Sequence, residues 1–160
     1  MPQFSVIIPA YNQAQFVADA IQSVLDQTFN DFEIIIINDA SPDTTAEVVA
    51  QFADPRIKSI LHEKNKGLPG ARNTGMSAAA GEFIALLDAD DTFHPQKLER
   101  HFNFLQNNHQ IDITYNARFE LHHSSKEIRT IYQPPTTVTL KDVLMGFPFS
   151  PSDMVLRRTC

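Results

Sequence analysis

Cysteine and tryptophan are scarce or missing in this sequence. Its 160 residues include one cysteine, Cys160, and no tryptophan. A lone thiol has no partner within the chain, which excludes an internal disulfide framework and a zinc site built from several thiolates. The amino-terminal stretch also lacks the basic start of a secretory signal peptide. These absences predict a cytoplasmic protein, either free or peripheral at the inner membrane.

Long apolar runs and an excess of positive charge are missing as well. No stretch reaches the roughly 18 apolar residues that a membrane-spanning helix needs, so we expect no transmembrane segment in this chain. The formal net charge of −6 argues against a general nucleic-acid-binding protein, because such proteins need a basic face to neutralise phosphates. We therefore expect no nucleic-acid partner, an exclusion that does not extend to a single nucleotide held at a local site.

The chain does contain enough apolar material for one core. Hydrophobic residues make up 42% of the sequence, and its ten prolines and five glycines form no low-complexity run. A chain of this length can build one sizeable core and is too short for two full domains. We expect a single ordered domain over residues 1–160.

Apolar runs of strand length alternate with helical patterns through the first 95 residues. Strands are predicted at residues 4–9, 32–37, 57–61 and 83–87, and helices at residues 14–27, 41–52 and 69–81. Ser41 and Pro42 form a predicted helix start, as N-cap and first helical residue. Pro69 is predicted to open the third helix and Gly81 to close it. This alternation predicts an α/β fold with parallel strands joined by right-handed crossovers.

The remaining residues follow a less regular pattern. Pro95 predicts the start of another helix, with Leu98, Phe102 and Leu105 on its buried face. A strand is predicted at residues 111–115, followed by short antiparallel strands that include residues 128–132 and 154–156, with a brief helix at residues 140–145. We therefore expect a Rossmann-like, mostly parallel sheet flanked by helices, with a short mixed or antiparallel carboxyl-terminal part.

Three aspartates follow the fourth predicted strand: Asp88, Asp90 and Asp91. The carboxyl ends of strands are where open α/β sheets bind their ligands. Mg²⁺ and Mn²⁺ accept carboxylate oxygens and complete their coordination with substrate phosphates. The aspartates therefore predict a metal site for a phosphorylated ligand, and a solvated acidic turn is the alternative.

Other motifs compete for the same residues. The run from Asp88 to Thr92 matches the Asp-x-Asp-x-Thr pattern of the haloacid dehalogenase phosphatases. Those proteins resemble this chain poorly in layout, because they carry the motif on their first strand and not on the fourth. An EF-hand is excluded, since Phe93 occupies the position that needs glycine. A P-loop is excluded because Met76 stands where the phosphate-binding lysine belongs.

Four blocks together resemble the family 2 glycosyltransferases, which have the GT-A fold. They are, in order, residues 5–12 (SVIIPAYN), 38–41 (NDAS), 65–75 (NKGLPGARNTG) and 88–91 (DADD). The resemblance covers about the first 100 residues. It implies transfer of a sugar, with inversion, from a nucleotide-diphosphate sugar to an unknown saccharide, lipid or protein acceptor. A UDP-sugar donor and a Mn²⁺ or Mg²⁺ cofactor are our first expectations.

The resemblance also implies roles for individual residues of these blocks. The implied nucleotide-binding residues are Pro9, Ala10, Tyr11, Asn12, Asp39, Arg72 and Asp88. Among them, Asp39 would accept a hydrogen bond from the base, and the guanidinium of Arg72 would engage base or phosphate. Asp90 would be the main metal ligand, with Asp88 and Asp91 beside it.

The position of the general base is a separate expectation. The resemblance implies an acidic motif beyond Cys160, and Asp153 is the candidate within this chain. We therefore expect a domain that is incomplete at its carboxyl end. Residues 1–115 would form its nucleotide-sugar-binding part, and residues 116–160 would begin its acceptor side. A nucleotide-sugar-binding module without turnover is the alternative function, and the phosphatase is the third.

Overall fold

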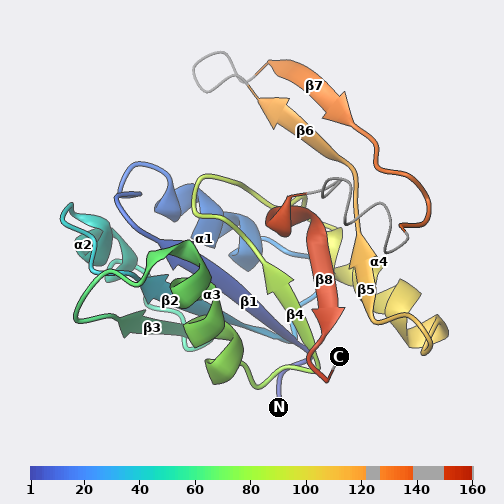
Figure 1. Cartoon of the computed structure of the whole chain (residues 1–160), viewed down its shortest axis with the longest axis horizontal. Helices are drawn as coiled ribbons and strands as arrows, with labels where there is room; N and C mark the ends of the chain where they lie inside the picture. Colours follow the sequence, from blue (N-terminus) through green and yellow to red (C-terminus); the bar gives the residue numbers. More distant parts are fainter. Residues whose placement is uncertain (122–126, 139–149, 160) are drawn as a thin grey trace.

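A six-stranded sheet forms the centre of the protein (Figure 1). The computed structural model describes residues 1–121, 127–138 and 150–159. In sheet order, the strands are β3 (Ile57–Leu61), β2 (Phe32–Asn38), β1 (Phe4–Ala10), β4 (Phe83–Leu86), β8 (Met154–Arg157) and β5 (Ile113–Tyr115). The first four are parallel, whereas β8 runs antiparallel to both β4 and β5. The predicted mostly parallel α/β sheet with an antiparallel addition is confirmed.

Helices pack on both faces of this sheet. On one face, α1 (Val17–Leu25), α2 (Thr45–Val49) and α4 (Lys97–Asn107) share the largest apolar core with the strands. On the other face lies α3 (Gly67–Ala78), which crosses in front of β1 and β2 (Figure 1). Successive strand residues point to opposite faces, so Val6 and Ile8 belong to the first core and Ile7 to the second. Because strands covered on both faces bury every residue, β1 and β2 are mostly apolar, with Ser5, Glu33 and Asn38 as their buried polar residues.

The predicted start of the second helix is wrong. Helix α2 begins at Thr45, and neither Ser41 nor Pro42 belongs to it. The Ser41 hydroxyl instead accepts a hydrogen bond from the main-chain N–H of Asn12, 2.9 Å away. Ala40, just before, has a left-handed backbone with φ 57°. The capping residue is thus used in a long-range contact between the loops that follow β1 and β2.

The predicted ends of the third helix also need correction. Helix α3 begins two residues before Pro69 and ends at Ala78, so Gly81 is not its cap. A Cβ on Gly81 would lie 2.6 Å from the main-chain nitrogen of Ser5. Gly81 therefore allows two backbone segments to approach closely. Gly75, inside the helix, permits a similar approach, since a Cβ there would lie 2.3 Å from Cγ2 of Ile7.

A second, two-stranded sheet projects from the body of the protein. Strands β6 (Arg118–Leu121) and β7 (Ile128–Tyr132) pair in antiparallel fashion and stand apart from the main sheet (Figure 1). The predicted strands at 128–132 and 154–156 are therefore confirmed, and a short 3₁₀ turn, η1 (Pro151–Asp153), leads into the second of them. The strand predicted from residue 111 begins at Ile113. The helix predicted at residues 140–145 lies outside the described residues.

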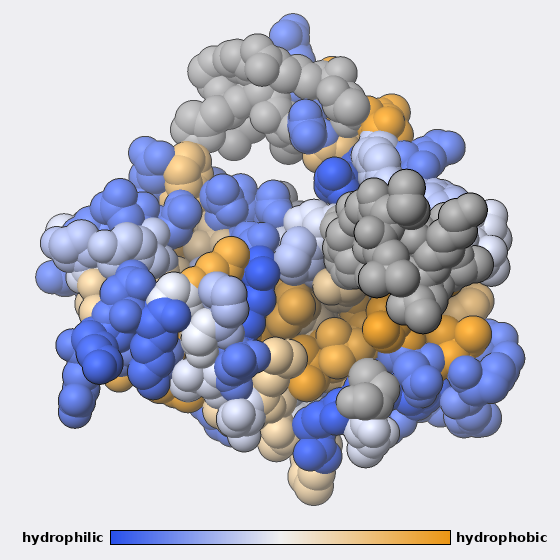
Figure 2. All heavy atoms as spheres, in the orientation of Figure 1, coloured by the Kyte–Doolittle hydropathy of each residue, from blue (hydrophilic) through white to orange (hydrophobic). Residues whose placement is uncertain are grey.

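Apolar residues also reach the surface on the α3 side of the sheet. Figure 2 shows them beside α3, over β4 and β8. There Met154 and Leu156 are partly buried against the small core around Ile7, Ile84 and Leu86. No helix in the described part of the chain is long and apolar enough to cross a membrane.

Candidate active site

The carboxyl ends of β1, β2 and β4 meet at one edge of the sheet. A cavity of about 430 Å³ opens there, which we call the strand-end cavity. Its walls come from the ends of these strands and from the start of α3: Pro9, Ala10, Tyr11, Gln13, Asp39, Asn65, Gly67, Leu68, Ala71, Asp88, Ala89 and Asp90. From β1, the chain adds β2 and β3 on one side of the sheet and then β4 on the other, so the strand order reverses between β1 and β4. Open α/β sheets usually bind their ligands at such a reversal.

Most of the nucleotide-binding residues predicted from the resemblance line this cavity. Pro9, Ala10, Tyr11, Asp39 and Asp88 all contribute to its walls. Tyr11 is half exposed, with 49% of its surface open at the rim. The other two predicted residues lie next to the cavity. One is Asn12, which follows Tyr11 in the chain with a left-handed backbone, and the other is Arg72, which contacts Asp88.

Asp39 is a buried hydrogen-bond acceptor in the cavity wall. It is 2% exposed, and its Oδ1 lies 2.5 Å from Nδ1 of His62 and 2.9 Å from the main-chain nitrogen of Lys66. Burial alone would raise the pKa of Asp39. Hydrogen bonds from His62, Lys66 and the N–H of Gly67, with the charge on His62, outweigh burial and lower that pKa below its usual value. The carboxylate is therefore ionised at neutral pH.

Arg72 and Asp88 form an ion pair beside the cavity. Nη2 of Arg72 lies 2.6 Å from Oδ1 of Asp88, and both side chains are partly buried. Nε of Arg72 is buried and has no hydrogen-bond partner among the described residues. An unpaired buried donor is costly, so a ligand oxygen that reached it would gain a strong charge-assisted bond.

The loop that follows β4 carries Asp88, Asp90 and Asp91, and we call it the acidic loop. Its three aspartates do not point into one site. Asp88 and Asp90 line the strand-end cavity, whereas the Asp91 carboxylate accepts a hydrogen bond from the Ser152 hydroxyl. Asp91 is exposed at the surface, yet desolvation by the groups around its carboxylate, followed by the charges of Asp90 and Asp88, raises its pKa above the usual value. Within the described residues, no three histidine, cysteine or acidic side chains gather as a ready metal site.

Two carboxylates still suit one class of metal ion. Mg²⁺ and Mn²⁺ are commonly held by one or two carboxylates, with waters and substrate phosphates completing the shell. Asp88 and Asp90 supply such a pair of hard oxygen donors on one cavity. The donor set therefore fits a divalent ion that arrives with a diphosphate, and it does not fit a metal held by protein alone.

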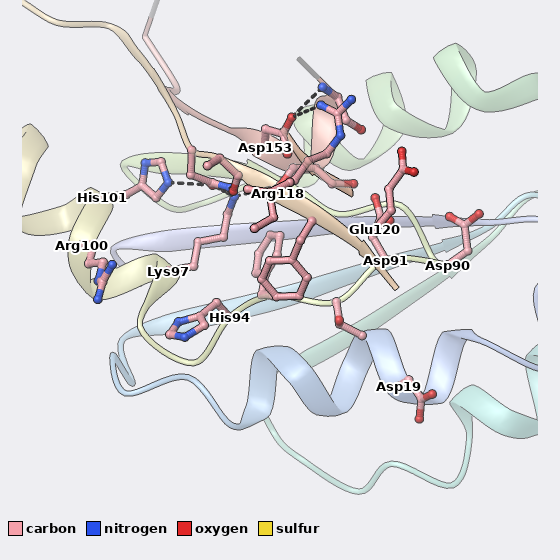
Figure 3. Close-up of a pocket in the computed structure, with 18 of the residues that line it drawn as sticks. Asp19, Asp90, Asp91, His94, Lys97, Arg100, His101, Arg118, Glu120 and Asp153 are labelled. Atoms are coloured by element: carbon pink, nitrogen blue, oxygen red, sulfur yellow. Dashed lines mark hydrogen bonds and ion pairs between the residues drawn. The ribbon is translucent and has the colours of Figure 1, made fainter. Parts of the chain in front are cut away.

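A larger cavity of about 830 Å³, which we call the hairpin cavity, lies under the β6–β7 hairpin (Figure 3). Helix α4, the acidic loop and η1 complete its walls. Its carboxylates are Asp19, Asp90, Asp91, Glu120 and Asp153, and its basic side chains include Lys97, Arg100, His101 and Arg118. Phe119 and Ile131, which pair across the hairpin, add an apolar wall. Asp90 lines both cavities, so the two spaces meet at this residue.

Lys97 and His101 form a buried polar cluster in the wall of the hairpin cavity. Nζ of Lys97 donates to Oδ1 of Asn116 and, at 2.9 Å, to the main-chain carbonyl of Ser152. Burial lowers the pKa of Lys97 to about 7. Burial, followed by the charge of Lys97, lowers the pKa of His101 to about 3, so this imidazole is neutral at pH 7. The cluster ties α4 to the turn that carries Asp153.

Asp153 holds the wall of the hairpin cavity. Its Oδ2 accepts hydrogen bonds from Nη1 of Arg118 at 2.7 Å and from the main-chain N–H of Ser150 at 2.8 Å (Figure 3). The Ser150 contact is one half of a capping box on η1. A carboxylate that took a proton from a substrate would weaken both bonds. The geometry therefore favours a structural role for the residue named above as the candidate base.

Comparison with known proteins settles the family. The model of glycosyl transferase family 2 matches residues 5–158. This chain belongs to that family. The predicted membership is confirmed, and the phosphatase alternative is set aside.

Individual relatives carry the same family character. An uncharacterized glycosyltransferase of Rickettsia conorii is 40% identical over 131 residues, which are 81% of this chain and 21% of that protein. The Escherichia coli protein WfgD, a UDP-Glc:alpha-D-GlcNAc-diphosphoundecaprenol beta-1,3-glucosyltransferase, is 34% identical over 97% of this chain and 60% of its own length. This chain thus spans between about a fifth and three fifths of these relatives.

Solved structures confirm the GT-A fold class. The crystal structure of S. aureus TarS 1-349 in complex with UDP-GlcNAc has a TM-score of 0.79 and 25% identity. The match covers 99% of this chain and 46% of TarS. A second crystal structure of the same TarS fragment contains UDP. The sheet and helices described above are therefore shared with a protein that binds these ligands.

Several residues in or next to the two cavities were not predicted from the sequence. They are Ser152, Lys97 and Arg118, which line the hairpin cavity, and His62, which lies behind Asp39. Each contacts a residue that was predicted, or the segment that holds it. His62 carried one signal, since it stands at the end of a predicted strand where ligand sites gather. The others follow from contacts between distant segments, which local patterns do not reveal.

Proposed function

We propose that the strand-end cavity binds a nucleotide-diphosphate sugar and that the enzyme transfers the sugar, with inversion, to an acceptor hydroxyl. The observation that carries this proposal is the convergence of Asp39, Tyr11, Asp88 and Asp90 on one cavity at the strand ends. A UDP-sugar is the donor we favour. TarS binds UDP and UDP-GlcNAc, and WfgD is a glucosyltransferase that uses UDP-Glc.

The proposed donor would lie with its base towards Asp39 and its phosphates towards the acidic loop. The ring of Tyr11, exposed at the rim, offers a flat apolar surface to a base. Asp39, as an ionised acceptor, takes a hydrogen bond from a base N–H. Arg72 supplies its unpaired Nε on the side of Asp88, where an oxygen of the donor can accept from it.

Asp88 and Asp90 would hold the divalent cation, with Asp91 beside them. A bound Mn²⁺ or Mg²⁺ ion supplies Lewis-acid stabilisation of the charge that develops on the departing diphosphate. The chain's own contribution is to place two carboxylates at the phosphate end of the cavity. Ser152 keeps this loop in position, because its hydroxyl accepts the N–H of Asp88 at 3.0 Å and donates to Asp91.

The hairpin cavity is the proposed acceptor side. It meets the donor cavity at Asp90, so an acceptor hydroxyl would approach the sugar from the side away from the nucleotide, which produces inversion. The proton of that hydroxyl would pass to a general base as the new bond forms. Its carboxylates and apolar hairpin wall suit a sugar hydroxyl next to an apolar group. WfgD acts on a diphosphoundecaprenol-linked sugar, and a lipid-linked acceptor of this kind would hold the enzyme at the inner membrane. We propose that residues 1–115 form the donor part and that residues 116–160 begin the acceptor side.

Calorimetric titration of UDP with and without Mn²⁺ tests the proposal. We expect wild-type protein to bind UDP in the presence of Mn²⁺, and we expect Asp90→Asn to lose at least about tenfold in affinity, because a charged ligand is replaced by an amide. Asp31→Asn is the matched control, since Asp31 is exposed at the opposite end of β2. Folded protein that binds no UDP under either condition would refute the UDP assignment. Metal-dependent binding without any sugar transfer or donor hydrolysis would indicate a binding module without turnover.

A further inference from the structure

A buried histidine lies directly behind Asp39. His62 follows β3, and its main-chain N–H donates to the carbonyl of Asn38, which extends the ladder between β2 and β3 by one bond. The imidazole is 5% exposed and sits between two partners. Nδ1 lies 2.5 Å from Oδ1 of Asp39, and Nε2 lies 2.9 Å from Oγ1 of Thr74 on α3. His62 itself is not part of the strand-end cavity wall.

The hydrogen-bond partners determine where the protons of this group lie. An ionised Asp39 has no proton to donate, so Nδ1 of His62 must carry the proton between them. Nε2 then faces the Thr74 hydroxyl, which also lies 3.0 Å from the carbonyl of Gly70. The Thr74 hydroxyl can donate to Nε2, or it can donate to the carbonyl of Gly70 and accept from Nε2. In both arrangements Nδ1–H points at Asp39.

This arrangement fixes one oxygen of the carboxylate. The side-chain bond from His62 and the main-chain bond from Lys66 both end on Oδ1 of Asp39. A carboxylate held in this way is an acceptor in a defined orientation. Such an acceptor favours a base edge that carries an N–H, as the imide of uracil does. It disfavours a base edge with a lone pair at the same position, as cytosine has.

We propose that His62, supported by Thr74, is a positioning residue that sets the base preference of the strand-end cavity by holding the Asp39 carboxylate as a fixed acceptor. The inference rests on the proposed function, in which Asp39 meets the base of the donor. Without His62, the buried carboxylate loses its strongest side-chain donor. It would then rotate or take up a proton, and a protonated carboxyl can donate to the lone pair of cytosine.

The test compares UDP with CDP, which differ at the pyrimidine edge and share ribose and diphosphate. Both are titrated with Mn²⁺ into wild-type, His62→Leu, His62→Asn and Thr74→Val proteins. We expect wild type to prefer UDP by about tenfold or more. In His62→Leu, UDP affinity should fall by about ten- to a hundredfold, a loss typical of removing a residue that positions a binding group. The ratio of UDP affinity to CDP affinity should approach one. His62→Asn should recover part of the preference, because its amide can donate to Asp39.

The outcomes separate this inference from the proposed function. Folded wild-type protein that binds neither nucleotide refutes the proposed function. Wild type that binds UDP and CDP equally, or a folded His62→Leu variant that keeps the wild-type UDP:CDP ratio, overturns the role of His62 and leaves donor binding intact. If His62→Leu does not fold by circular dichroism, the other two variants decide. Unchanged ratios in both His62→Asn and Thr74→Val overturn the inference, and reduced ratios in both support it.

Discussion

Nη2 of Arg72 lies 2.6 Å from Oδ1 of Asp88, which joins α3 to the loop that follows β4. The arginine side chain is 19% exposed and the aspartate side chain 25%. This pair reduces the negative charge of the acidic loop before any cation binds. It also holds the guanidinium, with its unpaired Nε, next to the strand-end cavity.

Replacing Arg72 should therefore weaken nucleotide binding more than it weakens the fold. For Arg72→Gln we expect a loss of about 1 kcal/mol in the free energy of unfolding, because a partly buried ion pair is removed. We expect UDP affinity in the presence of Mn²⁺ to fall by about tenfold, since a donor to the ligand is lost and Asp88 is left unpaired. Denaturant unfolding and calorimetry measure the two effects. Arg72→Lys, which keeps the charge without the planar fork, should be intermediate, and wild-type affinity in Arg72→Gln would contradict the assignment.

The Ser152 hydroxyl should stabilise the acidic loop. Its Oγ accepts from the N–H of Asp88 at 3.0 Å and donates to the Asp91 carboxylate. In Ser152→Ala both partners lose a hydrogen bond, so we expect the free energy of unfolding to fall by about 1 to 2 kcal/mol. Urea unfolding is the measurement. Ser59→Ala, at an exposed position on β3, is the control and should stay within about 0.5 kcal/mol of wild type. Equal effects in the two variants would argue against this role.

Lys97 should make the free energy of unfolding depend on pH in the alkaline range. Burial lowers its pKa from 10.5 to about 7 in the folded protein. Between these values the unfolded chain binds more protons than the folded chain, so stability should rise with pH by up to about 1.4 kcal/mol per unit. Below about pH 7 the lysine is protonated in both states, and its contribution to the slope should disappear.

Urea unfolding of wild type and Lys97→Met between roughly pH 6 and 9.5 checks this expectation. In the variant, the contribution of Lys97 to the slope of unfolding free energy against pH should be absent. It should also be less stable by about 1 to 3 kcal/mol at high pH, because Asn116 and Ser152 lose their donor. Lys64→Met, at an exposed site, should keep the wild-type slope. Parallel curves for wild type and Lys97→Met would show that Lys97 titrates near its ordinary pKa.

Gly75 should be needed for the close approach of α3 to the sheet. A Cβ at this position would lie 2.3 Å from Cγ2 of Ile7. We expect Gly75→Ala to lower the free energy of unfolding by about 1 to 3 kcal/mol, although alanine favours a helix, because the core must shift. In a double-mutant cycle with Ile7→Ala, the cost of Gly75→Ala should shrink, since the clashing methyl group is gone. Additive effects in that cycle would show that the cost of Gly75→Ala does not come from a clash with Ile7.

The order of strands and helices could be read from the sequence because the buried strands are rich in consecutive apolar residues. Residues 34–37 are four consecutive isoleucines, and residues 83–87 are wholly apolar before Asp88. A strand covered on both faces requires this composition, whatever its neighbours are. The acidic loop was visible for the same reason, since charge begins abruptly at the end of a buried strand.

Element ends were predicted less well because local preference competes with distant contacts. Ser41 is a good N-cap in isolation, yet its hydroxyl accepts from Asn12, 29 residues earlier. Gly81 is a good C-cap in isolation, yet it lies against the backbone at Ser5. In both cases a tertiary contact uses the residue that a local rule assigns to a helix end.

The sequence by itself determined the fold class, the family and the residue types at the strand ends. Only the tertiary structure decided which of these residues meet. Asp88 pairs with Arg72, Asp91 with Ser152, and Asp39 with His62, across separations of 16, 61 and 23 residues. These pairings depend on the strand order β3-β2-β1-β4-β8-β5 and on the face of the sheet that each helix covers. Periodicity reports which residues of a segment are buried, whereas strand order determines their neighbours.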